Sequence, residues 1–332
     1  MTHPRRLQTT RAFGWAVLAL VLIILAVVAV SLVVGAAGFA PGSANFRLIV
    51  EGIRLPRALL ALLIGGMLAV SGVYMQTLFQ NPLAEPYITG VSAGAGLGAV
   101  IALGVLPLAF SHLNLLLPAC AFAGGMAVTL LLFLLLRDAA SSPLKLLLLG
   151  IALGTLAASL MAFILIAFPE RMLRGALFWL FGSLAGASWW QVGIGTVVLV
   201  AGCAWGLLSF RALDALLLGR EDAHNLGVNV PRLSRWLLVV ATLLASVSVA
   251  FAGIVTFVGL VIPHIVRILF GAGHLKLIIL SLLCGMALVG IVDLAARQLM
   301  PPGEIPLSII TSLIGAPFFI LLLLKVRGGG YV

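Results

Sequence analysis

The chain has 332 residues, of which 63% are hydrophobic and only 8% are charged. A soluble domain carries roughly 25% charged residues, so these few charges could not cover the surface of a water-soluble fold. The net charge of +10 comes from Lys and Arg residues scattered between apolar runs, which indicates membrane topology rather than nucleic-acid binding. We therefore predict an all-α polytopic membrane protein that forms one transmembrane domain over residues 1–332.

Apolar runs predict ten membrane-spanning helices, since a spanning helix needs about 20 mostly apolar residues. The run from Trp236 to Val266 has no charge and is too long for one helix, so we place a break at Ala252-Gly253. The predicted helices cover residues 13–36, 57–78, 88–109, 115–136, 144–167, 189–209, 234–252, 256–270, 277–297 and 306–324.

The N-terminus has the basic start of a signal peptide, with Arg5, Arg6 and Arg11 before an apolar run. That run is much longer than a signal core of about 7–15 residues, so we interpret it as a retained first helix. About twice as many of the 19 Lys and Arg residues fall inside as outside when the N-terminus is cytoplasmic. With an even number of helices, both termini are predicted to be cytoplasmic.

The stretch from Gln76 to Gly90 is unusually polar for its surroundings and contains a single charged residue, Glu85. Pro82 and Pro86 cannot continue a helix from either side, so this stretch is predicted to be a structured turn. The topology places it on the cytoplasmic side, between the second and third helices. We interpret Glu85 as a residue that fixes this loop at the cytoplasmic surface.

Asp293 is the only carboxylate inside a predicted helix, and Arg297 follows four residues later on the same helical face. We interpret the two as a local ion pair at the outer end of the ninth helix, with a docking or pathway role as the alternative. No series of buried acids and histidines is present to relay protons. Proton-coupled transport is therefore disfavoured, whereas a sodium site built from backbone carbonyls would leave little trace in the sequence.

ATP hydrolysis by this chain is excluded by the surroundings of its lysines. A P-loop needs a Gly-Lys pair to cradle phosphates, but Lys145, Lys276 and Lys325 each follow a leucine. The histidines and cysteines show no metal-ligand spacing. We therefore predict no enzymatic activity, no cofactor and no metal site in this chain; any ATP and Mg²⁺ would be used by another polypeptide.

The longest inward-facing loop runs from Arg211 to Arg235. Leu218, Leu226 and Val228 stand among its charges, which is typical of a small amphipathic knob that inserts into a groove of a partner. The alternative is a charged loop that is simply solvated.

Several stretches of this sequence, taken together with their order and spacing, resemble one family. That family is the permease subunits of ABC importers for iron-siderophores, haem and cobalamin. They are Arg54-Leu55-Pro56-Arg57, the small-residue run 65–72, 76–94 with its core Asn81-Pro82-Leu83-Ala84-Glu85-Pro86, 147–153, 218–227, 252–264, Ala296-Arg297, Glu304-Ile305-Pro306 and Gly315-Ala316-Pro317-Phe318-Phe319. One departure is Gln80, where many relatives have Arg.

This resemblance implies a transmembrane permease domain of about ten helices in the cytoplasmic (inner) membrane of a bacterium. It implies a homodimer with the pathway at its interface, two ATP-binding subunits on the cytoplasmic face and a substrate-binding protein on the outer face. The cargo would be a large iron chelate, a siderophore or haem, with cobalamin as the next choice, moved by alternating access.

The resemblance also assigns roles to residues by position. It implies a cytoplasmic gate at Asn81, Leu83, Ser141 and Ser142, and binding-protein docking by Arg54, Arg57 and Arg297. It implies an ATPase coupling loop that agrees with the knob above and comprises Leu218, Gly219, Arg220, Glu221, Asp222, Ala223, His224, Asn225, Leu226 and Gly227.

Two rival functions stay open from the sequence. One is an ion-coupled secondary transporter that acts without an ATPase, and the other is a purely structural membrane subunit. Uptake driven by an ion gradient alone would favour the first, and normal transport after damage to the gate loop would favour the second.

Overall fold

The computed structural model describes residues 3–34, 46–105, 113–135, 143–301 and 303–326, and all regular elements in these ranges are helical. This confirms the predicted all-α class. The elements are α1 (His3–Val33), α2 (Phe46–Ile49), the π-helical turn η1 (Val50–Arg54), α3 (Leu55–Phe79), the 3₁₀ turn η2 (Pro86–Thr89), α4 (Val91–Val105), α5 (Leu113–Leu135), α6 (Pro143–Ile166), α7 (Glu170–Leu180), α8 (Trp189–Leu216), α9 (Arg220–Asn225), α10 (Val230–Ala252), α11 (Val258–Phe270), α12 (His274–Gln298) and α13 (Leu307–Val326).

The ten predicted spans all correspond to helices. Within the described ranges, seven helices are long and apolar enough to cross a membrane, and α4, α11 and α13 are shorter apolar helices. The charge-free run from Trp236 breaks where predicted, since α10 ends at Ala252 and Gly253 adopts a positive φ of 70°. Two helices extend well beyond the predicted bounds: α1 begins at His3 rather than at residue 13, and α8 continues from the predicted end at residue 209 to Leu216.

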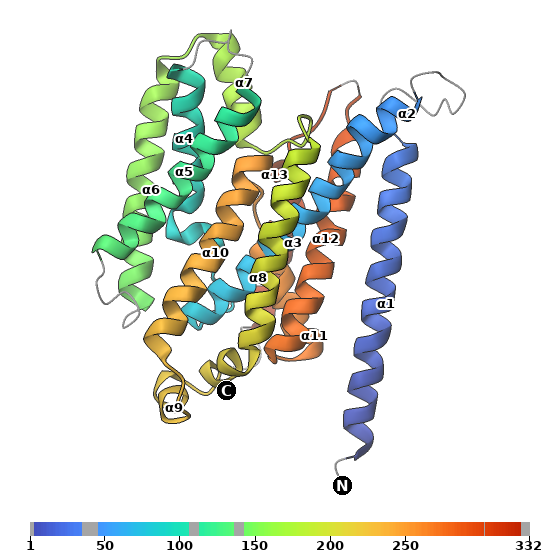
Figure 1. The fold of residues 1–332 in the computed structure, drawn as a ribbon, viewed down its shortest axis with the longest axis vertical. Helices are drawn as coiled ribbons and strands as arrows, with labels where there is room; N and C mark the ends of the chain where they lie inside the picture. The colour runs from blue at the N-terminus through green and yellow to red at the C-terminus, as the bar shows by residue number, and fades with distance from the viewer. Residues whose placement is uncertain (1–2, 35–45, 106–112, 136–142, 302, 327–332) are drawn as a thin grey trace.

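Helix α3 forms the centre of the bundle and is buried along almost its whole length. It packs against α12, α10, α8 and α11 (Figure 1). Small residues allow this close packing: a Cβ added to Gly65 would lie 2.0 Å from the carbonyl oxygen of Gly285, and one added to Gly72 would lie 1.9 Å from that of Gly259. The small residues of the second predicted helix therefore serve helix packing.

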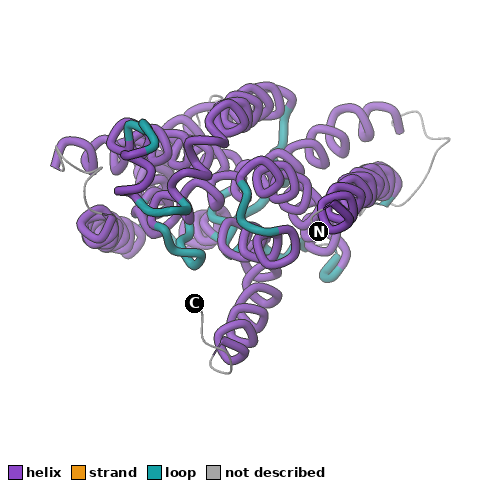
Figure 2. Tube along the Cα trace, turned by 90° about the horizontal axis from the view of Figure 1, so that it is seen from below, coloured by secondary structure: helices purple, strands orange, loops and turns teal. Residues whose placement is uncertain are grey.

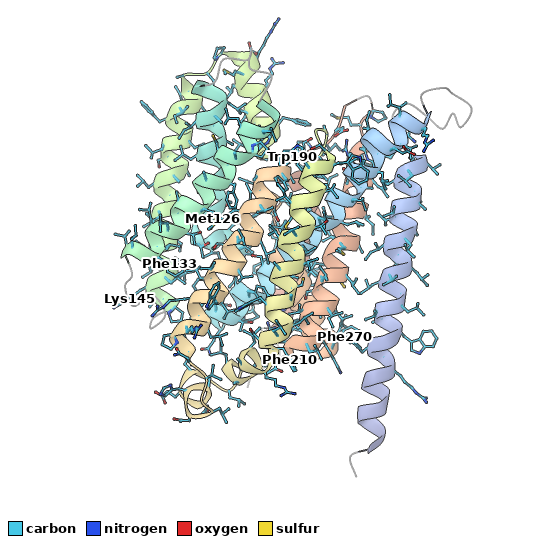
Figure 3. The ribbon with its side chains drawn as sticks, viewed as in Figure 1. Met126, Phe133, Lys145, Trp190, Phe210 and Phe270 are labelled. Atoms are coloured by element: carbon cyan, nitrogen blue, oxygen red, sulfur yellow. The ribbon has the colours of Figure 1, made fainter. Side chains whose placement is uncertain are left out.

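The two ends of the molecule carry different elements. Helix α9 lies at the lower end, where α1 begins and α13 ends, and α2 and α7 lie at the upper end (Figure 1). Seen from below, the helices cluster side by side, while α1 and α13 stand at the periphery (Figure 2). Lys145 lies at the lower end of α6 and Trp190 at the upper end of α8 (Figure 3). The lower end is thus the side that the charge distribution assigns to the cytoplasm.

Helix α7 is an amphipathic helix that the apolar pattern does not predict, because it is short and carries Glu170, Arg171 and Arg174. The chain after it forms irregular backbone that hydrogen-bonds to the break between α10 and α11. Ser183 N–H donates to the Ala252 carbonyl at 2.9 Å, and Ile254 N–H donates to that of Leu180 at 3.2 Å. These bonds satisfy backbone groups that no lipid could satisfy.

Candidate functional site

The predicted gate loop begins as a tight turn at the lower end of α3. Gln80 ends the helix in a left-handed conformation with φ of 48°. The Asn81 side-chain oxygen accepts a hydrogen bond from the Leu83 backbone N–H at 2.9 Å, and Asn81 N–H donates to the Gln76 carbonyl at 3.1 Å. Asn81 is exposed and Leu83 is half-buried. The asparagine therefore shapes the turn while its side chain remains accessible.

The second half of this loop turns back into the bundle. The Glu85 carboxylate accepts a hydrogen bond from the Phe257 backbone N–H at 3.0 Å, and the Tyr87 hydroxyl donates to the Val255 carbonyl at 3.1 Å. Glu85 fixes the loop as expected, but the expectation that it does so at the cytoplasmic surface is wrong. Its carboxylate faces the extended segment before α11, because the unpaired N–H groups at the start of that helix need acceptors.

Two of the four predicted gate residues, Ser141 and Ser142, lie outside the described residues. The next described residue is Pro143, the first residue of α6. The gate role of all four residues stays a prediction.

The predicted coupling loop folds as a short helical knob. Gly219 and Gly227 bound it with φ of 114° and 85°, and α9 lies between them. Ala223 is fully buried and anchors the knob, whereas Leu218 and Leu226 are 63% and 65% exposed. Glu221 and Asp222 occupy the first turn of α9, where the helix dipole favours acidic side chains. The knob therefore presents leucines and charges together, as an inserting element requires.

The structure brings the gate loop and the knob together at the lower end. A cavity of about 410 Å³ lies between them, lined by Gln80, Asn81 and Pro82 on one side and by Leu218 and Gly219 on the other. Hydrogen bonds beside the cavity connect its two sides. The Gln80 side-chain amide donates to the Leu216 carbonyl at 3.0 Å. The Arg220 guanidinium donates to the Leu78 carbonyl at 3.3 Å. Displacement of the knob would thus act directly on the end of α3.

The arginines predicted to dock a binding protein lie together at the opposite end, but all three side chains are buried. Arg57 donates to both oxygens of Glu304 at 2.6 and 2.9 Å and pairs with Asp293 at 2.9 Å. Glu304 is the more exposed carboxylate, at 28% of its side chain against 1% for Asp293. In this conformation Arg57 is thus neutralised from within the chain.

Arg297 and Arg54 complete this outer cluster through different contacts. Arg297 pairs with Asp293 at 3.0 Å, as the spacing predicts, and also donates to the Ser31 hydroxyl at 2.7 Å. Arg54 donates to the carbonyls of Leu32 and Val33 at 2.8 and 2.9 Å, where α1 leaves carbonyls unpaired. The cluster therefore ties α1, α3 and α12 together, and a docking role for its arginines stays a prediction.

Sequence reasoning missed one buried polar group near the gate. His274, the first residue of α12, bonds to Asp214 of α8 and to Thr77 of α3. The signal in the sequence is weak: a lone carboxylate at the end of one helix and a histidine after a glycine-containing turn. No three His, Cys, Asp or Glu residues gather at metal-binding distances in the described part of the chain.

Known proteins match this chain over most of its length. The sequence model of the FecCD transport family matches residues 15–325. The chain is 41% identical over 286 residues to the Fe(3+) dicitrate transport system permease protein FecD of Escherichia coli strain K12, covering 86% of this chain and 88% of that protein. It is 39% identical over 281 residues to the hemin transport system permease protein HmuU of Yersinia pestis, covering 83% of each.

A vitamin B12 import system permease protein, BtuC of Klebsiella pneumoniae, is 38% identical over 334 residues, covering 98% of this chain and 97% of that protein. Among solved structures, a metal-chelate type ABC transporter in an inward-facing conformation superimposes with a TM-score of 0.84 at 32% identity. The superposition covers 93% of this chain and 98% of that one.

Proposed function

This chain belongs to the FecCD transport family, and on that premise we propose that it is the permease subunit of a binding-protein-dependent ABC importer in the cytoplasmic membrane of a bacterium. Two copies would enclose the pathway, two ATPase subunits would bind the cytoplasmic face, and a substrate-binding protein would deliver cargo outside. ATP and Mg²⁺ belong to the ATPase in this proposal, because the sequence has no Gly-Lys pair for a P-loop.

The observation that carries this proposal is the placement of the knob beside the gate loop. The cavity that separates Leu218 and Gly219 from Asn81 and Pro82 is lined by both segments, and the Gln80 amide bonds across to Leu216. An ATPase that grips the knob and changes shape would therefore move the end of α3. That movement would open or close the passage at Asn81 and Leu83 by alternating access.

The proposed cargo is a large metal chelate, an iron-siderophore or haem first and cobalamin next. Support comes from relatives named for Fe(3+) dicitrate, hemin and vitamin B12, all of which are chelates of a metal in an organic ligand. The chain offers no metal-binding cluster among the described residues, so it would hold the organic shell of the cargo rather than the metal.

Docking of the binding protein is proposed at the outer cluster of arginines. Because Arg57 is held by Glu304, an acidic residue of the binding protein would have to compete with this internal carboxylate. Glu304 is the partly exposed member of the cluster and is the one that a partner could displace.

Transport by the reconstituted complex tests the proposal. The permease, its cognate ATPase and its binding protein are placed in liposomes, and uptake of radiolabelled ferric citrate, haemin and cobalamin is measured. We expect uptake of one chelate that requires ATP, the ATPase and the binding protein together. Uptake by the permease alone under a proton or sodium gradient would overturn the proposal in favour of an ion-coupled secondary transporter.

A further inference from the structure

Three side chains from three helices form a continuous hydrogen-bonded chain at the lower end of the bundle. The Asp214 carboxylate on α8 lies 2.7 Å from Nδ1 of His274, and Nε2 of His274 lies 2.8 Å from the hydroxyl of Thr77 on α3. His274 is fully buried, whereas the Asp214 side chain is 38% exposed. The same Asp214 oxygen accepts the His274 backbone N–H at 2.8 Å. Asp214 therefore holds both the imidazole and the first turn of α12.

The donors and acceptors of these three side chains are all in use, so a change at one side chain affects its neighbour. The Thr77 hydroxyl also lies 2.8 Å from the Val73 carbonyl, and a hydroxyl has only one hydrogen to donate. If Thr77 donates to Val73, His274 must donate from both ring nitrogens, to Thr77 and to Asp214. If the imidazole is neutral, the hydroxyl must turn from Val73 to Nε2. In either state, a shift of Asp214 moves the imidazole and so changes the hydrogen bond between His274 and Thr77. Arg267 of α11 is another charged group that acts on this imidazole.

Asp214 and Thr77, the two outer members of this hydrogen-bonded series, lie next to the knob and the gate loop. Asp214 lies four residues before Leu218, where the knob begins, and Thr77 lies four residues before Asn81. Between the knob and the gate loop themselves lies the cavity of about 410 Å³, which Thr77 also lines. Empty space transmits little force, so the bonded side chains beside the cavity are the stiffer connection.

We propose that Thr77, His274 and Asp214 are positioning residues that transmit displacement of the knob to the gate loop. This inference rests on the proposed function, because it presupposes an ATPase that moves the knob. When α8 shifts, Asp214 carries the start of α12 and the imidazole with it, and Thr77 passes the shift to the last turn of α3. The direct bond from Gln80 to Leu216 acts in parallel.

The test uses the full complex with ATPase and binding protein in nanodiscs, with the three native cysteines replaced by alanine and Pro82→Cys as an exposed reporter in the gate loop. The rate of maleimide labelling is measured without nucleotide and with ATP and vanadate. Thr77→Val removes the hydroxyl but keeps the side-chain shape, and Thr77→Ser restores the hydroxyl. Thr242→Val is the matched control, since Thr242 is also buried but, among the described residues, its hydroxyl bonds only to carbonyls of its own helix α10.

We expect Thr77→Val to reduce the nucleotide-dependent change in labelling rate about tenfold, the size of effect expected for the loss of the buried hydrogen bond to His274. Thr77→Ser should restore the change, and Thr242→Val should retain it. The proposal would be overturned if Thr77→Val kept the full nucleotide-dependent change in labelling rate, or if Thr242→Val lost as much of it as Thr77→Val. If the reporter protein with native Thr77 shows no nucleotide-dependent change in labelling rate, the proposed function fails. That result differs from one in which only the role of Thr77, His274 and Asp214 fails.

Discussion

The Glu85 carboxylate and the Phe257 backbone N–H, 172 residues apart in the chain, meet at 3.0 Å where α11 begins. Phe257 is a non-glycine residue with φ of 66°, a left-handed conformation that needs support from its surroundings. The bond from Glu85 supplies part of that support. The loop after the gate turn is thereby fastened to the break between α10 and α11, so movement of one segment involves the other.

Replacement of Glu85 should separate the effect of the hydrogen bond from that of the charge. Burial raises the pKa of Glu85 above its usual value, so the folded protein binds this proton more tightly than the unfolded chain does. The contribution of this group to stability is therefore greatest at acidic pH and declines as pH rises above the usual carboxyl range. Glu85→Gln keeps an oxygen acceptor for Phe257 and should abolish that decline.

Thermal unfolding in detergent between pH 4 and pH 8, followed by tryptophan fluorescence, measures this difference. Glu85→Ala leaves the Phe257 N–H without an acceptor and should cost about 1–3 kcal/mol at acidic pH. The cost should become smaller as pH rises, because the contribution of Glu85 itself declines. Equal pH dependence in the wild type and Glu85→Gln would show that the carboxylate is not the titrating group.

The contact between α3 and α11 should not tolerate one added methyl group. Gly72→Ala places a Cβ 1.9 Å from the Gly259 carbonyl oxygen, which is backbone and has little freedom to move. We expect a loss of about 1–3 kcal/mol or more in unfolding free energy. Gly193→Ala in α8 is the control, because nothing lies within 4 Å of its added Cβ and alanine favours the helix. Similar melting temperatures for the two variants would contradict the close contact between α3 and α11.

Glu304→Gln should strengthen docking of the binding protein if Glu304 shields Arg57. The amide removes the negative charge that now neutralises the guanidinium. We expect a several-fold lower Kd that depends more steeply on salt, because an unshielded charge attracts acidic partners over longer distances. Surface plasmon resonance on nanodiscs at two ionic strengths measures both effects. Glu170→Gln is the control, since Glu170 forms an exposed pair with Arg174 on α7 at the same end.

Charge reversal at Arg57 would give a less direct answer. Its removal breaks a buried ion pair with Asp293 and should destabilise the fold by about 3–5 kcal/mol. A loss of docking in Arg57→Glu would therefore need a melting measurement beside it. Unchanged stability would mean that the cluster contributes little to holding α3 against α12.

Leu226→Ala should weaken attachment of the ATPase without unfolding the knob. Leu226 is exposed beside α9, whereas the fully buried Ala223 holds the knob in place. We expect about a tenfold weaker interaction, in line with the loss of an apolar anchor from an interface. Co-purification of the ATPase at increasing dilution measures this loss. Leu208→Ala, which removes an exposed leucine from the apolar surface of α8, should have no effect, and an equal loss there would point to general destabilisation.

The sequence by itself determined the elements whose signals are local. Apolar runs determined where the ten main helices form, Gly253 determined the break after α10, and Gly219 and Gly227 determined the limits of the knob. The ion pair of Asp293 with Arg297 followed from their spacing on one helix. In each case the deciding interaction lies within a few residues of chain, or between the chain and the membrane.

Tertiary structure alone decided which distant groups meet. It turned Glu85 inward to Phe257, paired Arg57 with Glu304 and joined Thr77 to His274. Apolarity places a residue in the membrane but does not say which helix it faces, whereas hydrogen bonds and ion pairs need partners within about 3 Å. Those partners lie between 172 and 247 residues apart in the chain, so only the packed bundle brings them together.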